Sequence, residues 1–177
     1  MLYKVLSLLL QYPDAELLGN LDEIQAVVAA LEATSPEDRR TVIDFLDSLR
    51  ARPLMDLQAD YVQTFDLTPD NTLHLTNHLF DEQDRARGPA LVNLAEYFKR
   101  AGLELAQHEL PDYLPLLLEY VSTLEDQMSV RGFLQQTSAA VATIAENLEK
   151  LGSHYAPLLR LVERHGLVAE QKTAATA

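Results

Sequence analysis

The stretch SPEDRRTVIDFLDSL, residues 35–49, carries the signals of a helix that begins at a cap and buries one face. The Ser35 hydroxyl can accept a hydrogen bond from a free N–H of the first turn, and Pro36 fixes the backbone at the first helical position. Acidic residues follow, and apolar residues then recur every three or four positions. These apolar residues are Val42, Phe45, Leu46 and Leu49. The pattern predicts an amphipathic helix packed against a core.

The same apolar spacing recurs along most of the chain, and no alternation of period two is long enough to predict a sheet. Further helices are predicted over 2–10, 17–31, 54–65, 88–101, 112–126, 130–151 and 154–165. Gly102, Gly152 and Gly166 stand where C-terminal caps are expected. The sequence therefore predicts an all-α protein: a single compact domain of about eight helices over residues 1–166, followed by a disordered tail at 167–177.

Composition restricts the possible classes of protein. Hydrophobic residues make up 47% of the 177 residues and charged residues 23%, which is typical of a globular domain. There is no cysteine, so disulfides, thiolate nucleophiles and iron-sulfur ligation by this chain are excluded. Pro13 and Asp14 follow the first apolar run where a signal-peptide cleavage site would lie, so this run is interpreted as a core helix. No apolar run approaches the roughly 18 residues that span a bilayer, which predicts a soluble protein with no membrane insertion.

The charge is strongly acidic and unevenly distributed. Lys and Arg number 14 and Asp and Glu 27, giving a net charge of -13, which disfavours nucleic acid and favours basic ligands. No Lys or Arg lies between Arg100 and Arg131. Within this interval, Asp112, Glu119 and Asp126 are spaced by seven, so a continuous helix would place them on one face.

That acidic row has two interpretations. Tyr113 and Tyr120 flank it at the same spacing, and carboxylates beside aromatic rings suit a groove for a basic amphipathic peptide. Alternatively, the row is the solvated face of a helix in an acidic protein, with Asp112 as an N-cap ahead of Pro115. The residues alone leave both interpretations open.

The stretch YVQTFDLTPDNTLHLTNHLF, residues 61–80, holds His74 and His78 four positions apart. Two histidines on one helical face could begin a metal site, but no His-Glu-x-x-His or Glu-x-x-His pattern accompanies them. Hydrogen-bonding histidines and no metal are therefore expected. No Gly-x-Ser-x-Gly elbow or phosphate-binding loop is present either, so no catalytic residue and no enzyme activity are predicted.

Three segments together resemble one protein family: residues 61–80, RGPALVNLAEYFKRAGLE (87–104) and ELPDYLPLLLEY (109–120). They are similar to the respiratory nitrate reductase delta subunit, the molybdenum-cofactor assembly chaperone of the NarJ type. This family belongs to the redox-enzyme maturation chaperones, which include those of the trimethylamine-oxide and dimethyl-sulfoxide reductases. The similarity extends from Met1 to about Leu151.

The resemblance implies an all-helical NarJ/TorD-like fold and a cytoplasmic chaperone with no catalytic activity. It implies binding of the N-terminal leader-like segment of the apo nitrate reductase catalytic (alpha) subunit. The chaperone would hold that subunit while molybdenum cofactor and an iron-sulfur cluster are inserted, and would then leave it. No cofactor of its own is implied.

The family's peptide-binding motif, Glu-Pro-x-Asp-His, is matched by Glu109 and Asp112. Leu110 stands at the proline position and Tyr113 replaces the histidine, so any role that needs the histidine is in doubt. A second signature, an aromatic residue four positions before Phe, is matched by Tyr61 and Phe65. The predicted peptide-binding residues form two walls, which are Tyr61, Phe65, Asp66, Pro69, His74 and His78 in the first and Glu109, Asp112, Tyr113 and Glu119 in the second.

The alternative is a helical protein that itself carries a metal or molybdenum cofactor, or binds a nucleotide directly. Anionic cofactors need clustered basic side chains, and Arg85 and Arg87 are the tight basic pair near the motifs. Ordinary surface charge at the start of a helix is the favoured explanation of this pair, and the sequence argues against the alternative.

Overall fold

The computed structural model describes residues 1–81, 83–105 and 109–174, and describes side chains up to Gly166 apart from that of Gln127. Within these residues the chain forms ten α-helices and no strand, and eight of the helices have eight residues or more. The prediction of an all-α fold of about eight helices is therefore confirmed. Also within the described residues, no helix combines the length and apolarity that crossing a bilayer requires.

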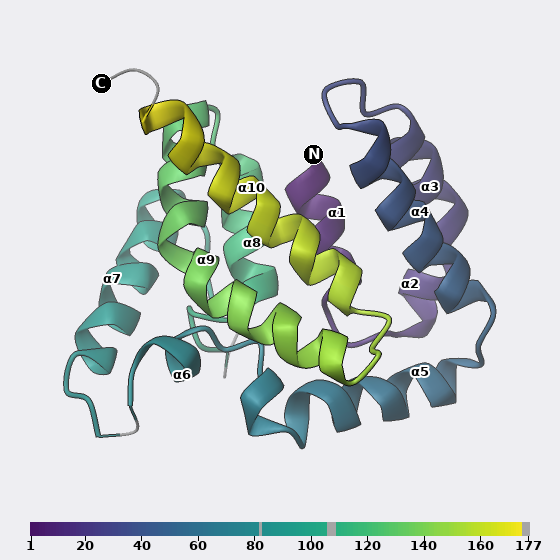
Figure 1. The fold of residues 1–177 in the computed structure, drawn as a ribbon, viewed down its shortest axis with the longest axis horizontal. Helices are drawn as coiled ribbons and strands as arrows, with labels where there is room; N and C mark the ends of the chain where they lie inside the picture. Colours follow the sequence, from purple (N-terminus) through teal and green to yellow (C-terminus); the bar gives the residue numbers. More distant parts are fainter. Residues whose placement is uncertain (82, 106–108, 175–177) are drawn as a thin grey trace.

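The helices are α1 (Leu2–Leu9), α2 (Ala15–Gly19), α3 (Leu21–Ala29), α4 (Pro36–Arg50), α5 (Leu54–Tyr61), α6 (Thr76–Leu79), α7 (Arg87–Arg100), α8 (Leu114–Thr123), α9 (Gln127–Lys150) and α10 (Ala156–Ala174). Two short helical segments lie between α5 and α6. The first is a π-helix at Val62–Asp66, which is wound more widely than an α-helix, and the second is a 3₁₀-helix at Pro69–Asn71, which is wound more tightly. Figure 1 shows α3 and α4 on one side, α7 on the other, and α5 along the lower edge.

Helix α4 forms as its sequence predicts. The Ser35 Oγ accepts a hydrogen bond from the Asp38 backbone N–H at 3.0 Å, and Pro36 is the first helical residue. The apolar face of α4, including Phe45, is buried, with Leu46 fully shielded from solvent. Capping and burial therefore act on the same helix, and each contributes to its stability.

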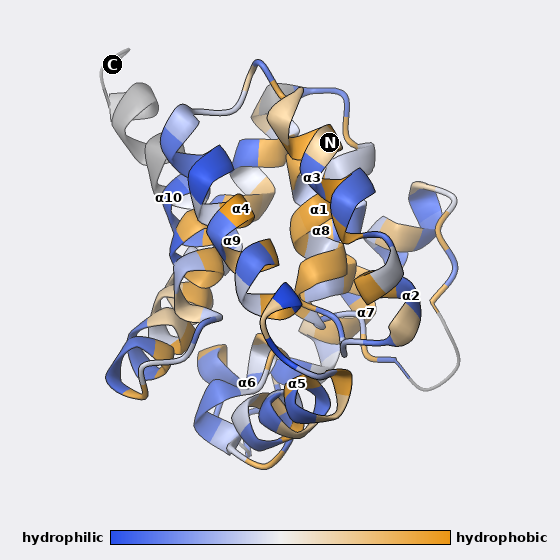
Figure 2. Cartoon of the chain, turned by 90° about the vertical axis from the view of Figure 1, so that its right-hand side faces the viewer, coloured by the Kyte–Doolittle hydropathy of each residue, from blue (hydrophilic) through white to orange (hydrophobic). Residues whose placement is uncertain are grey.

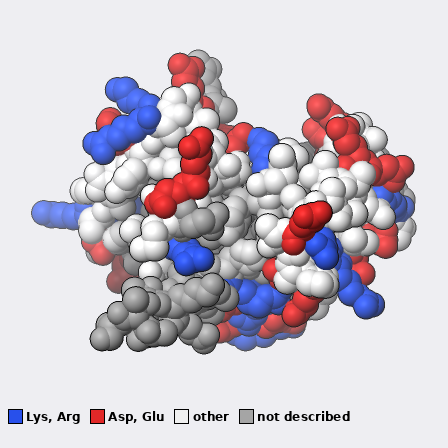
Figure 3. Space-filling model, turned by 90° about the horizontal axis from the view of Figure 1, so that it is seen from above, with Lys and Arg blue, Asp and Glu red and all other residues white. Residues whose placement is uncertain are grey.

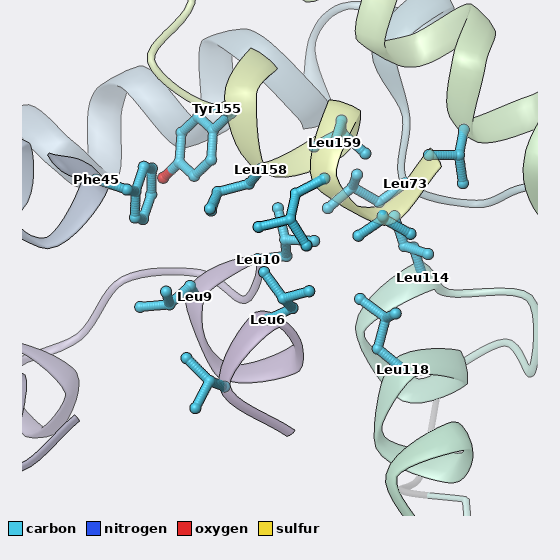
Figure 4. Close-up of a cluster of buried hydrophobic side chains, with 14 of the residues drawn as sticks. Leu6, Leu9, Leu10, Phe45, Leu73, Leu114, Leu118, Tyr155, Leu158 and Leu159 are labelled. Atoms are coloured by element: carbon cyan, nitrogen blue, oxygen red, sulfur yellow. The ribbon is translucent and has the colours of Figure 1, made fainter. Parts of the chain in front are cut away.

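The core is centred on α1, which packs along α8. Leu6 and Leu10 have no exposed surface, and Figure 4 shows them among leucines from α8 and α10. In the cartoon of Figure 2, α1 and α8 are largely coloured as hydrophobic and lie near the centre, with more hydrophilic segments around them. Since α1 is packed on several sides, its position is fixed, and it can serve as a rigid wall for a surface site.

Two of the three predicted glycine caps are confirmed. Gly102 and Gly152 have φ angles of 74° and 65°, and they follow the ends of α7 and α9. This left-handed conformation favours glycine. The turn at Gly152 then returns the chain, so that α10 packs along α9.

The predicted cap at Gly166 is wrong, because α10 continues through it to Ala174. A Cβ atom at Gly166 would lie 3.0 Å from the backbone oxygen of Leu134 in α9. The glycine therefore permits close approach of two helices rather than ending one. The disordered tail at 167–177 stays a prediction, since residues 175–177 lie outside the described residues.

Replacing Gly166 by leucine is expected to lower the free energy of unfolding by about 2 kcal/mol, because the new side chain collides with the α9 backbone. Gly132→Ala in α9 is the matched control, since no atom lies within 4 Å of a Cβ at Gly132. That change is expected to raise stability by about 0.5–1 kcal/mol through helix propensity. Urea unfolding measures both; equal effects of the two substitutions would contradict the close contact.

Candidate functional site

The two sequence segments predicted as walls are joined by backbone hydrogen bonds. His74 and Tyr113 form an isolated antiparallel bridge. Its bonds run from the Leu75 N–H to the Asp112 oxygen at 3.1 Å and from the Leu114 N–H to the Leu73 oxygen at 2.9 Å. Residues nearly forty positions apart in sequence therefore lie side by side, as the two-wall prediction requires.

Asp112 lies behind this bridge, with 0% of the residue exposed. Its Oδ2 accepts hydrogen bonds from the backbone N–H of Thr76, at 3.1 Å, and from the Thr76 hydroxyl, while its Oδ1 lies 3.2 Å from Nδ1 of His74. The Nε of Arg87 donates to Thr76 Oγ1 at 3.0 Å and extends the network to α7. Burial opposes the charge, but the bonds from His74 and Thr76 prevail and hold the carboxyl pKa below its usual value.

The predicted acidic row on one helix face is therefore wrong. Helix α8 runs only from Leu114 to Thr123, so Asp112 precedes it and Asp126 follows it. Asp126 instead caps α9, where its carboxylate accepts from the N–H groups of Met128 and Ser129. The spacing of seven does not correspond to one continuous helix, and of the three acids only Glu119 lies on α8.

Two hollows meet on the surface beside the bridge. The first, which we call the aromatic hollow, has a volume of about 330 Å³ and is lined by rings of Tyr12, Tyr61, Phe65 and Tyr113 together with Asp66, His74 and Glu109. The second, the Glu119 hollow, has a volume of about 320 Å³ and is lined by Glu119, Pro115, Leu116 and Gln11. The two hollows share three lining residues, which are Tyr12, Glu109 and Tyr113. The hollows therefore form one depression, which we call the trough.

The floor of the aromatic hollow is fixed by packed rings. Tyr61 and Phe65 are each 3% exposed, and their ring centroids lie 4.9 Å apart. The Tyr61 hydroxyl donates to the backbone oxygen of Leu10 at 3.1 Å. Since that uses its only proton, the Tyr113 hydroxyl, 2.8 Å away, must donate to Tyr61. Burial raises the pKa of Tyr61, so this hydroxyl stays protonated.

The π-helix at Val62–Asp66 determines how this floor ends. The Leu67 N–H bonds to the Val62 oxygen at 2.9 Å, five residues back, which widens the last turn after α5. Phe65 is buried by this turn, whereas Asp66 is exposed on the trough. Single π-turns are rare and recur at functional sites. The sequence predicted a plain helix over 54–65 and did not reveal this turn.

The remaining predicted residues have separate places. His78 Nε2 lies 2.8 Å from the Thr72 backbone oxygen and donates to it, and the His74 ring packs against Tyr113 at 5.3 Å. Both histidines make hydrogen bonds within the first wall or across to Asp112, as predicted. Pro69 starts the 3₁₀-turn, is exposed, and does not line the trough. Among the described residues, no three His, Asp or Glu side chains are grouped closely enough to hold a metal ion.

The rim of the trough is predominantly acidic. Asp66 and Glu109 are exposed, and Glu119 is half-buried and paired with Lys4 of α1. Tyr12 and Gln11, just after α1, were not among the predicted site residues. No local pattern identifies them, because they reach the trough only through the packing of α1 against α8.

Stability is expected to fall below about pH 4, because the pKa values of the Asp112 and Asp38 carboxyls are lowered in the folded state. In the unfolded chain an Asp carboxyl has a pKa of about 3.9. The unfolded state therefore binds more protons than the folded state as the pH falls. The contribution of each carboxylate is complete above that pH and is lost as the pH falls through the folded pKa. Urea unfolding at several pH values should show a shallower acid decline for Asp112→Asn than for the wild type; parallel declines would contradict the assignment.

The fold and the trough define an all-helical protein whose surface carries a depression lined by aromatic and acidic side chains. The chain belongs to the nitrate reductase delta subunit family, whose model matches residues 23–160.

Proteins similar in sequence to this chain are named as nitrate reductase assembly chaperones. The chain is 35% identical to the nitrate reductase molybdenum cofactor assembly chaperone NarJ of Escherichia coli K12, over 89% of this chain and 66% of that protein. It is 31% identical to the probable chaperone of the same name from Bacillus subtilis, over 90% of this chain and 85% of the relative. The probable chaperone NarW of Escherichia coli K12 is 40% identical over 74% of this chain and 53% of its own length. The chain thus spans just under two thirds of the Escherichia coli NarJ protein.

Proposed function

We propose that this protein is a cytoplasmic assembly chaperone for nitrate reductase. It binds the N-terminal leader-like segment of the apo catalytic (alpha) subunit in the trough. It keeps that subunit competent to receive molybdenum cofactor and an iron-sulfur cluster before membrane assembly, and it takes no part in catalysis. Family membership and the names of the relatives support nitrate reductase as the client and molybdenum cofactor assembly as the step.

The observation that best supports the proposed binding site is the junction of the two walls. The His74–Tyr113 bridge places aromatic surfaces and carboxylates of both walls around one depression. Aromatic rings bind the apolar side of a peptide, and carboxylates pair with its Lys or Arg side chains. Asp112 supports the wall from behind, whereas Glu109, Tyr113 and Glu119 face the trough.

The alternative, direct carriage of cofactor or nucleotide, is not favoured by any observed contact. Arg87, one of the two arginines that it would use, donates to Thr76 and so supports the first wall. Phosphate groups are held by clustered basic side chains, whereas the described rim of the trough carries Asp66, Glu109 and Glu119.

Calorimetry tests the proposal with a peptide that copies the N-terminal segment of the catalytic subunit from the same organism. Saturable binding is expected, with affinity that falls as salt is added, because the Debye length shortens. Co-expression of the two chains should also yield a complex that contains the cofactor-free subunit. Absence of peptide binding together with absence of the complex would overturn the proposal.

A further inference from the structure

A third hollow lies along α1, on the side of α2 and α3. Its volume is about 450 Å³, and we call it the α1 groove. Apolar side chains from three helices line it, which are Val5, Leu8, Leu17, Ile24 and Val27. Val5 and Ile24 are buried, whereas the other three are half-buried. A rigid wall with a half-exposed apolar surface is what a partner helix can cover.

The α1 groove is continuous with the trough. Gln11 and Tyr12 line both the groove and the Glu119 hollow, and Tyr12 also lines the aromatic hollow. Tyr12 is 47% exposed and packs edge-on against Tyr61, with ring centroids 5.6 Å apart. A polypeptide that leaves the trough toward α1 must therefore pass over Tyr12.

The charges around the groove favour a basic occupant. Asp14, Glu16 and Glu23 line it and are exposed. Lys4 is the basic side chain on its lining, and it is paired with Glu119. Figure 3 shows acidic side chains, with basic ones among them, on its right-hand side, where α3 and α4 stand in Figure 1. The groove thus combines apolar walls with an excess of negative charge at its edge.

We propose that the α1 groove is a second subsite for the same client segment. It takes the part of that segment beyond the trough as an amphipathic helix, with apolar residues against Leu8 and Val27 and Lys or Arg toward Glu16 and Glu23. A helix that lies alongside α1 from Met1 to Gln11 has about ten residues, at about 1.5 Å of rise per residue. Tyr12 separates the two subsites and contacts the segment where it crosses between them. This inference rests on the proposed function and specifies its partner.

The test uses a peptide of about twenty residues from the client N-terminus and its two halves, each about the length of α1. Glu16→Lys with Glu23→Lys reverses charge at the groove on exposed positions. Glu96→Lys with Glu146→Lys is the matched control, because both positions are exposed on α7 and α9 and do not line the three hollows. Calorimetry at low salt measures each peptide against each variant.

The groove variant is expected to bind the full peptide and one of its halves about tenfold or more weakly than the control variant does. Its affinity for the other half should be unchanged. Glu109→Gln with Glu119→Gln should weaken the opposite half. Tyr12→Ala should lower the affinity for the full peptide more than it lowers the affinity for either half. Equal effects of the groove and control variants, or a groove variant that changes the oligomeric state instead of peptide affinity, would overturn the second subsite.

The two proposals fail differently. If the wild type binds one half as tightly as the full peptide, and the groove variant changes neither, the second subsite is wrong while the trough remains the binding site. If the wild type binds none of the three peptides, the proposed function is wrong, and the second subsite falls with it.

Discussion

Asp112→Ala is expected to lower the free energy of unfolding by about 3 kcal/mol, the largest loss among the single substitutions considered. The change leaves the Thr76 N–H, the Thr76 hydroxyl and the His74 ring without their shared acceptor in a buried position. Removing one partner from a buried network costs the desolvation of every group left unpaired. Urea unfolding at neutral pH measures the loss.

Two further variants define the role of Asp112. Asp66→Ala is the control, because Asp66 is an exposed carboxylate on the same wall, and its loss should change stability by less than about 0.5 kcal/mol. Asp112→Asn keeps one acceptor oxygen and is expected to fall between the two. A stability for Asp112→Ala equal to that of Asp66→Ala would show that the network does not hold the walls together.

Tyr113→Ala is expected to weaken binding of the client peptide by about 10- to 100-fold, or about 1.4–2.7 kcal/mol. Tyr113 lines both hollows of the trough and packs against His74, so its ring supplies aromatic surface at their junction. Calorimetry measures the change in affinity at a temperature where both the wild type and the Tyr113→Ala variant remain folded.

Tyr113→Phe separates the ring from the hydroxyl. It removes the hydrogen bond to Tyr61 but keeps the aromatic surface, so affinity should stay within about threefold of the wild type while stability falls by about 1 kcal/mol. If Tyr113→Ala binds the peptide as tightly as Tyr113→Phe, the ring is not part of the binding surface.

Local signals predicted most of the helices, because capping and apolar spacing act within a few residues. The Ser35 cap and the turns at Gly102 and Gly152 are examples. Gly166 resembles these glycines in sequence, but its role depends on the Leu134 backbone, which α9 brings against it. The predicted helix over 17–31 is likewise divided, since α2 ends at Gly19 and α3 begins at Leu21.

The candidate site was predicted in part. The motif resemblance selected two segments that the structure joins, but it could not show that Asp112 is buried behind them. That burial depends on Thr76 and His74, which are distant in sequence. Tyr12 was missed for the same reason, because only the packing of α1 against α8 brings it to the trough. Contacts between distant segments therefore decide which of the predicted residues line the trough and which support its walls.

The central claim is that the client segment binds in the trough, and a nuclear magnetic resonance titration of the labelled protein with the client peptide tests it most directly. The predicted result is that the largest amide shifts fall on Tyr12, Phe65, His74 and Tyr113, which line the trough. Arg52 and His154 line a separate hollow, which none of these four trough residues line. Shifts concentrated at Arg52 and His154, with the trough residues unchanged, would contradict the account.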